Sequence, residues 1–185
     1  MSTTTTQLVP AGTYAADPAH SRVGFAVKHL GIATVRGTFE RFDGSLVVGD
    51  DPRDVTFSAT IDAASVDTAE EQRDAHLRSA DFFDVEQHPT LTFASTRVTP
   101  VDDDTFRIVG DLTMHGVTRE VELEAVVQGA ETDPWGNERV GFEITGQLSR
   151  GEFGMTFNQA LGSGNLLVSD RVKLSLDVSA IRQAA

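Results

Sequence analysis

Cysteine is absent from this chain of 185 residues, which excludes a disulfide-stapled fold, a cysteine-ligated zinc site and a cysteine nucleophile. Basic residues are scarce, since 15 Lys and Arg stand against 28 Asp and Glu and give a net charge of −13. Nucleic acids and anionic lipid surfaces are bound through Lys and Arg, so neither is an expected partner. No stretch approaches the roughly 18 apolar residues of a membrane-spanning helix, so an integral membrane protein is not expected.

The N-terminal segment lacks the features of a secretory signal. Residues 1–12 are polar and threonine-rich, with neither a basic start nor an apolar core. We therefore expect a flexible tail over residues 1–12, a single domain over residues 13–182 and a cytoplasmic location. A chain of this length buries about 70% of its unfolded surface, so it needs neither disulfide nor metal to fold.

What the sequence does contain is a series of segments in which apolar and polar residues alternate. This period of two is typical of strands with one buried face. About eight long strands without an intervening linker predict one all-β domain, an eight-stranded antiparallel barrel, because the strands are long for the alternative two-sheet sandwich. Residues 34–49 are rich in Phe and Val, and we expect a turn or bend at Asp43-Gly44. The alternation is clearest in residues 22–28, 55–62, 91–98, 105–116, 118–127, 139–150 and 171–180.

One segment departs from this alternation. Thr68, followed three residues later by Glu71, fits a capping box. This pattern predicts a short helix over about Ala69–Ser79, with Thr68 as its N-cap, inserted between two strands.

The polar residues give no local catalytic or metal-binding signature. The histidines do not form HExxH, HxH or a two-histidine-plus-carboxylate pattern, so no metal site is predicted, although residues distant in sequence could still meet. A Gly-x-Ser-x-Gly elbow is absent, and Ser21 next to His20 points to the opposite face of a strand. An enzyme is therefore not expected, and no catalytic residue is assigned. The five histidines are His20, His29, His76, His88 and His115.

The inward-facing positions are rich in Phe and Met, and two interpretations of them stay open. They form either an ordinary packed core or the lining of a cavity for an apolar ligand, and the pattern alone does not separate the two. In the second interpretation the lumen is lined by Phe25, Val27, Phe39, Phe57, Ile61, Phe93, Phe106, Ile108, Leu112, Met114, Leu123, Phe142, Ile144, Phe153, Met155, Leu174 and Leu176.

Four blocks of the sequence, in the same order, resemble the YceI-like family. The resemblance implies a lipocalin-like barrel whose apolar lumen binds polyisoprenoids, isoprenoid quinones or other long-chain amphiphiles without a cofactor. It also makes a homodimer an expected assembly. Many relatives are periplasmic and carry a signal sequence, and this chain departs from them there. The blocks are DPAHSRVGFAVKHLGIATVRGTF (residues 17–39), RDAHLRSADFFDVEQHPTLTF (73–93), GDLTMHGVTREVEL (110–123) and SRGEFGM (149–155).

The same blocks contain polar residues that belong to the family motif. His115 ends one strand and Gly116 begins a tight turn, where we expect Gly116 to have a positive φ. We expect His115 to form a hydrogen bond near the end of this hairpin, and a structural role is favoured over contact with a ligand at the barrel mouth. The polar motif residues are His20, His29, His76, Arg78, His115 and Arg150.

The expected function is therefore non-catalytic binding, transport or storage of an isoprenoid or other long-chain amphiphile in the lumen. Burial of each CH₂ group contributes about 0.8 kcal/mol, so such a site selects length and shape more than polar chemistry. Two alternatives remain. One is an enzyme that acts on a lipid-like substrate through His, Asp or Glu at the mouth, and the other is a filled barrel that serves as a stress-linked interaction module.

Overall fold

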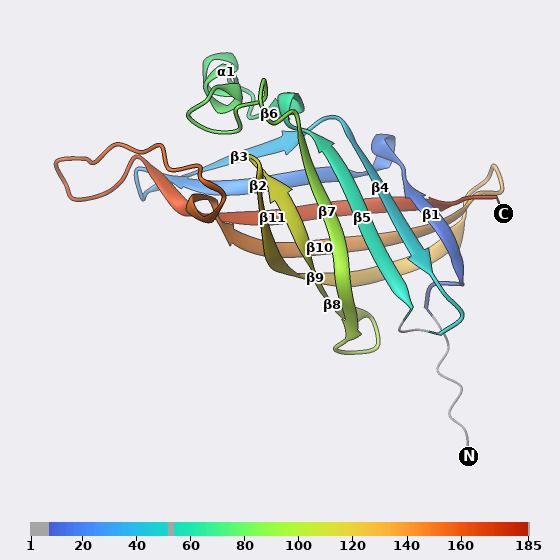
Figure 1. Cartoon of the computed structure of the whole chain (residues 1–185). Coiled ribbons are helices and arrows are strands. Elements are labelled where there is room, and N and C mark those ends of the chain that lie inside the picture. Colours follow the sequence, from blue (N-terminus) through green and yellow to red (C-terminus); the bar gives the residue numbers. More distant parts are fainter. Residues whose placement is uncertain (1–7, 52–53, 185) are drawn as a thin grey trace.

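The computed structural model describes residues 8–51 and 54–184, and its main feature is an antiparallel β-barrel (Figure 1). In chain order the elements are β1 (Gly12–Ala16), η1 (Pro18–His20), β2 (Arg22–His29), β3 (Ala33–Phe39), β4 (Phe42–Val48), β5 (Val55–Asp62), η2 (Ala63–Ser65), β6 (Val66–Asp67), α1 (Glu71–Arg78), β7 (Thr90–Pro100), β8 (Thr105–Met114), β9 (Val117–Thr132), β10 (Glu138–Ser149), η3 (Arg150–Phe153) and β11 (Val168–Arg182).

Eight strands close the barrel in the order β1-β4-β5-β7-β8-β9-β10-β11, and β11 pairs in turn with β1. Strand β11 pairs along one edge with β10, and along the other edge first with β2 and then with β1. Strands β2, β3 and β6 therefore extend the sheet beyond the closed ring. The predicted fold class, an eight-stranded antiparallel barrel with one inserted helix, is confirmed.

The alternation of the sequence explains which face of each strand is buried. In β9, Glu120, Glu122 and Glu124 are exposed, whereas Ala125 is buried and Leu123 packs against the core. Successive side chains of a strand point to opposite faces, so one face of β9 meets water and the other meets the interior. The long strand with a charged outer face is thereby fixed in its register, because a slip of one residue would bury the glutamates.

The two ends of the barrel differ in how they are closed. Helix α1, the turn between β8 and β9, and η3 lie at one end, called the helix end here, and the C-terminus lies at the other, called the terminal end (Figure 1). A cluster of buried side chains around Tyr14, Val140 and Phe142 fills the terminal end. A second cluster, which includes Val66 and Phe153, lies at the helix end.

Helix α1 is shorter than predicted, and the assignment of Thr68 as its N-cap was wrong. The N-cap is Glu70, whose carboxylate accepts hydrogen bonds from the backbone N–H groups of Gln72 and Arg73. The Thr68 hydroxyl instead donates to the buried carboxylate of Asp74, and Arg73 donates to that hydroxyl. Thr68 is therefore held by side chains of the helix that follows, and the helix begins two residues later than a Thr68 cap requires.

The expected turn at Asp43-Gly44 was also wrong, because both residues lie inside β4. The chain bends instead at Glu40 and Arg41, between β3 and β4. The backbone N–H of Glu40 donates to the Ser65 carbonyl, and that of Arg41 donates to the Ser65 hydroxyl. The bend is thus fixed by contacts with η2 rather than by turn residues of its own.

The predicted N-terminal tail of residues 1–12 falls partly outside the described residues, which begin at residue 8. From there the chain lies against the barrel, since Val9 is buried and the Tyr14 hydroxyl donates to the Pro10 carbonyl. Within the described residues, no helix has the length and apolar character needed to cross a bilayer.

Candidate functional site

A cavity of about 240 Å³ lies inside the barrel. All eight barrel strands, together with β2 and β3, contribute to its wall, and the lining side chains are almost all apolar. Asp43 and Arg150 are the charged residues of this wall. The inward faces of the strands therefore enclose a hollow that is suited to an apolar molecule.

The cavity wall contains most of the residues that the alternation assigned to the lumen. Two positions are corrections, because Phe106 and Phe153 do not line the cavity. Phe106 is the second residue of β8 and packs against the cluster at the terminal end, and Phe153 is completely buried in η3. For Phe106, the alternation predicts which face of the strand a side chain lies on, but not how far along the barrel it lies. For Phe153, the alternation does not apply, because η3 is not a strand. The lining residues that were predicted are Phe25, Val27, Phe39, Phe57, Ile61, Phe93, Ile108, Leu112, Met114, Leu123, Phe142, Ile144, Met155, Leu174 and Leu176.

Three further lining residues come from the helical insertion and were not predicted. Leu77 lies in α1, and Phe82 and Phe83 follow it. The ring of Phe83 packs edge-on against that of Phe39, with 5.5 Å between the centroids. The two adjacent Phe residues were visible in the sequence, but a helix of eight residues gave too little periodicity to show that they cover the lumen.

Arg150 is the one predicted polar motif residue that lies in the cavity wall. Its guanidinium donates hydrogen bonds to three backbone carbonyls, at 2.7 Å to Met155, 3.0 Å to Ser169 and 3.2 Å to Val168. The side chain is only 5% exposed, and this burial lowers the pKa of Arg150, which nearby Asp170 partly offsets. Arginine keeps its charge even so, and this cation ties η3 to the start of β11.

Arg78 and His76 hold the helical insertion together outside the cavity wall. Arg78 donates to the carbonyls of Ala64 and Val66, at 2.8 and 2.9 Å, and so fixes α1 to η2 and β6. His76 lies 2.8 Å from a carboxylate oxygen of Asp81. These two motif residues therefore position the segment that covers the lumen.

The other two motif histidines of the first block lie elsewhere. His20 is the last residue of η1, and its exposed ring pairs at 2.8 Å with Asp17, the N-cap of η1. His29 ends β2, where its register partners are Ala33 and Val168. The structure therefore does not bring all the motif residues into one site.

His115 and Gly116 form the two-residue turn between β8 and β9. Their φ angles are 54° and 72°, so the predicted positive φ of Gly116 is confirmed and His115 shares it. Two central residues with positive φ suit the right-handed twist of a tight hairpin. A nitrogen of His115, Nδ1, lies 3.0 Å from the carbonyl oxygen of Phe153, which gives the hydrogen bond expected at this hairpin end.

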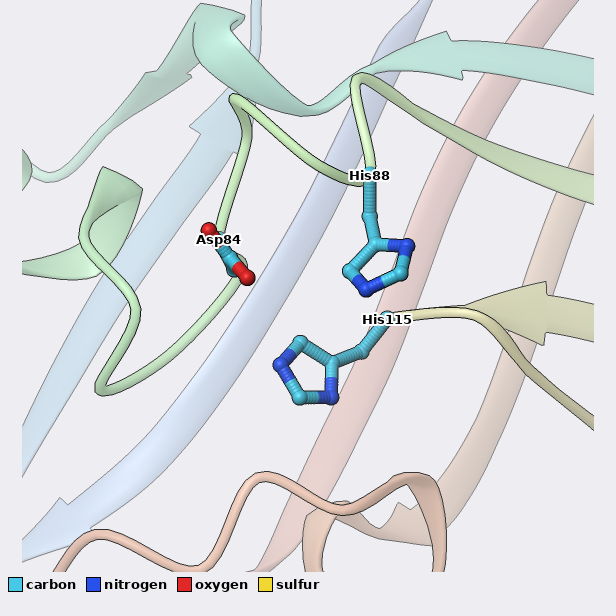
Figure 2. Close-up of side chains that lie close together, drawn as sticks. All are labelled: Asp84, His88 and His115. Carbon is cyan, nitrogen blue, oxygen red and sulfur yellow. The ribbon is translucent and has the colours of Figure 1, made fainter.

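His115 also lies beside two residues that sequence reasoning left without a role. The centroids of the His88 and His115 rings are 5.1 Å apart. Asp84 is the third member, and potential ligand atoms of all three residues lie within 4.8 Å of one another (Figure 2). Asp84 and His88 precede β7, whereas His115 follows β8, so no local spacing in the sequence reveals this group.

Comparisons with known proteins agree with this architecture. Residues 14–180 match the model of the YceI-like domain. A UPF0312 protein of Ectopseudomonas mendocina is 42% identical over 165 residues, which cover 89% of this chain and 83% of that protein. The protein YceI of Escherichia coli O157:H7 is 40% identical over 165 residues, which likewise cover 89% of this chain and 83% of that protein.

Solved structures show the same barrel. A YCEI protein of Campylobacter jejuni has a TM-score of 0.71 and 32% identity, over 91% of this chain and 96% of that one. BcnA of Burkholderia cenocepacia has a TM-score of 0.78 at 21% identity, over 89% and 98% of the two chains. A polyisoprenoid binding domain from Saccharophagus degradans has a TM-score of 0.71 at 14% identity, over 92% and 98%. The last two similarities concern the fold alone.

Proposed function

The chain belongs to the YceI-like family, and from this premise we propose that its barrel binds the apolar chain of an isoprenoid or other long-chain amphiphile and carries or stores it unchanged. The observation that carries the proposal is the cavity of about 240 Å³ with an almost wholly apolar wall. The name of the structurally similar polyisoprenoid binding domain supports the choice of ligand class.

The size of the cavity limits how much of a ligand it holds. A cavity of about 150 Å³ accommodates benzene, and pockets for drug-sized ligands begin near 300 Å³. A volume of 240 Å³ therefore suits one end of a hydrocarbon chain, with the remainder in an opening or in space made by side-chain movement. Each buried CH₂ contributes about 0.8 kcal/mol, so a short chain segment already gives useful affinity.

The positions of the histidines favour binding over catalysis. All five belong to the part of the chain that the structure describes, and none of them lines the cavity. A general acid or base must come within hydrogen-bonding distance of the reacting group, and Arg150 already donates to three carbonyls. The cavity also argues against a filled barrel that acts only as an interaction module.

The first experiment is native mass spectrometry of the full chain purified without detergent, followed by organic extraction and identification of released molecules. We then expect farnesol, added as an isoprenoid probe, to bind with one molecule per chain. Replacement of Leu174, which lines the cavity from β11, by Trp should fill the lumen and lower the affinity for farnesol at least tenfold.

The matched control is Ser175→Trp, at the next position of the same strand, where the side chain is exposed. It should leave farnesol binding unchanged. A wild-type protein that binds neither farnesol nor a co-purified amphiphile would contradict the proposal, as would equal binding by a folded Leu174→Trp variant.

A further inference from the structure

We propose that Asp84, His88 and His115 form a binding site for one divalent transition-metal ion at the helix end of the barrel. Potential ligand atoms of the three side chains already lie within 4.8 Å of one another, and all three residues are half-buried. Figure 2 shows the Asp84 carboxylate and the two imidazoles turned toward a common space. Two imidazole nitrogens and one carboxylate oxygen are a set of protein ligands that zinc and iron sites use.

The hydrogen bond of His115 leaves the correct nitrogen available. Nδ1 of His115 is 3.0 Å from the Phe153 carbonyl oxygen, and a carbonyl only accepts, so Nδ1 carries the hydrogen. In the neutral ring, Nε2 then has the free electron pair that a metal needs. Donation of the second ring N–H to a backbone carbonyl is the usual arrangement for a metal-bound histidine, since it fixes both tautomer and orientation.

Two glycines make room for the two imidazoles. A Cβ atom at Gly116 would lie 2.7 Å from Cε1 of His88, and one at Gly154 would lie 3.3 Å from Nδ1 of His115. The rings are therefore packed directly against backbone rather than held loosely in solvent. Side chains positioned in this way lose little freedom when they bind an ion, which favours a preorganised site.

Asp84 and His88 are held relative to one another by a single turn. The Asp84 carbonyl accepts hydrogen bonds from the backbone N–H groups of Gln87 and His88, at 3.0 and 2.8 Å. Asp84 has a φ of 48° and His115 a φ of 54°, a region that favours glycine. Both positions nevertheless carry side chains that can bind metal.

The composition of the group selects the kind of ion. Magnesium and calcium prefer sites made wholly of oxygen ligands, whereas imidazole suits zinc and its first-row neighbours. Three protein ligands leave at least one coordination position for water or another molecule. The ion would join the segment before β7 to the β8–β9 turn, next to Phe83 and Met114, which line the cavity. This site does not depend on the proposed lipid function.

The test is isothermal titration of ZnCl₂ into the full chain, purified without a polyhistidine tag and treated with chelator, with native mass spectrometry to count bound ions. We expect one Zn²⁺ per chain and a rise in Tm when zinc is added, because an ion that binds only the folded state stabilises it. His88→Gln and Asp84→Asn should each lower the affinity at least tenfold and reduce the rise in Tm.

The control is His20→Gln. His20 pairs with the carboxylate of Asp17, but this pair has no third potential metal ligand beside it in the described part of the chain. Among the described residues, only Asp84, His88 and His115 form a group of three potential metal ligands. Zinc affinity should be unchanged in this variant. Asp84→Asn nearly keeps the size of the side chain, so it decides the question if His88→Gln does not fold. Absence of stoichiometric zinc binding by the wild type, or wild-type affinity in a folded Asp84→Asn variant, would overturn the site.

Discussion

The two ends of the barrel are built by different means. The terminal end consists of paired strands whose inward side chains, such as Tyr14 and Val140, pack almost without exposure. The helix end is assembled from α1, the segment before β7, the β8–β9 turn and η3, and it depends on individual polar contacts of Arg78, Arg150 and His115. Strand periodicity therefore specifies one end, and particular hydrogen bonds between distant segments specify the other.

The largest expected effect comes from Phe153, which is completely buried at the helix end but does not line the cavity. Phe153→Ala should lower the free energy of unfolding by about 3–5 kcal/mol, because it creates a void among packed neighbours. Urea denaturation measures this loss. A loss of this size would show that side chains are tightly packed around Phe153 at the helix end.

Leu174→Ala is the matched comparison for Phe153→Ala. Leu174 lines the cavity and belongs to neither cluster of buried side chains, so it has fewer neighbours to lose. We expect a loss of at most about 2 kcal/mol, the low end for a buried leucine. A loss as large as that of Phe153→Ala would mean that the lumen is filled in solution.

The next effect concerns Arg150, which holds η3 to β11. Arg150→Met removes three hydrogen bonds and takes this donor from the carbonyls of Met155 and Ser169, whereas Asn158 still donates to the Val168 carbonyl. A buried group left unpaired costs about 1–3 kcal/mol. We expect a loss of about 2–3 kcal/mol in urea denaturation. Arg36→Met, at an exposed position of β3, is the control and should change stability little. Equal effects of the two substitutions would show that the Arg150 contacts do not hold the helix end.

The wall of the barrel could be predicted from the sequence because its determinants are local. An alternating strand such as β5 shows its buried face in eight consecutive residues, and its predicted bounds, Val55–Asp62, agree with the structure. Phe106 was misassigned because it faces inward as expected but lies too far along the barrel to reach the cavity. Depth depends on strand stagger, which no single strand encodes.

The helix end could be predicted only in part. The motif identified His115 and Arg150 as important, and the His-Gly pair correctly indicated a tight turn. The partners of these residues could not be found, because Phe153 and His88 approach His115 through folding and not through spacing. Thr68 was misassigned because Asp74, six residues later, accepts a hydrogen bond from its hydroxyl, a contact that the capping-box pattern does not include. Loops and turns have no repeating apolar pattern, so the sequence does not show which of their residues will come into contact.

The smallest expected effect concerns an ion-pair group near the terminal end. Arg139 lies 2.8 Å from carboxylate oxygens of both Asp17 and Asp133, and its side chain is 22% exposed. Its hydrogen bond is the main cause that lowers the pKa of Asp17 from 3.8 to about 2, with His20 second. Arg139 likewise lowers the pKa of Asp133. Arg139→Gln removes the largest cause of both shifts.

The pH dependence of stability tests this group. A carboxyl group whose pKa is lower in the folded state binds more protons when unfolded, so stability falls as pH drops. The contribution of Asp17 is fully present above about pH 3.8 and is lost as the pH falls toward 2. Thermal unfolding of Arg139→Gln should therefore show a slightly lower Tm at pH 7 and a shallower decrease between pH 4 and 2. The control is Arg107→Gln, which breaks an exposed pair with Glu122 and should leave the wild-type slope intact. Parallel Tm profiles for Arg139→Gln and the wild type would mean that Arg139 does not lower the pKa of these carboxyl groups in the folded state.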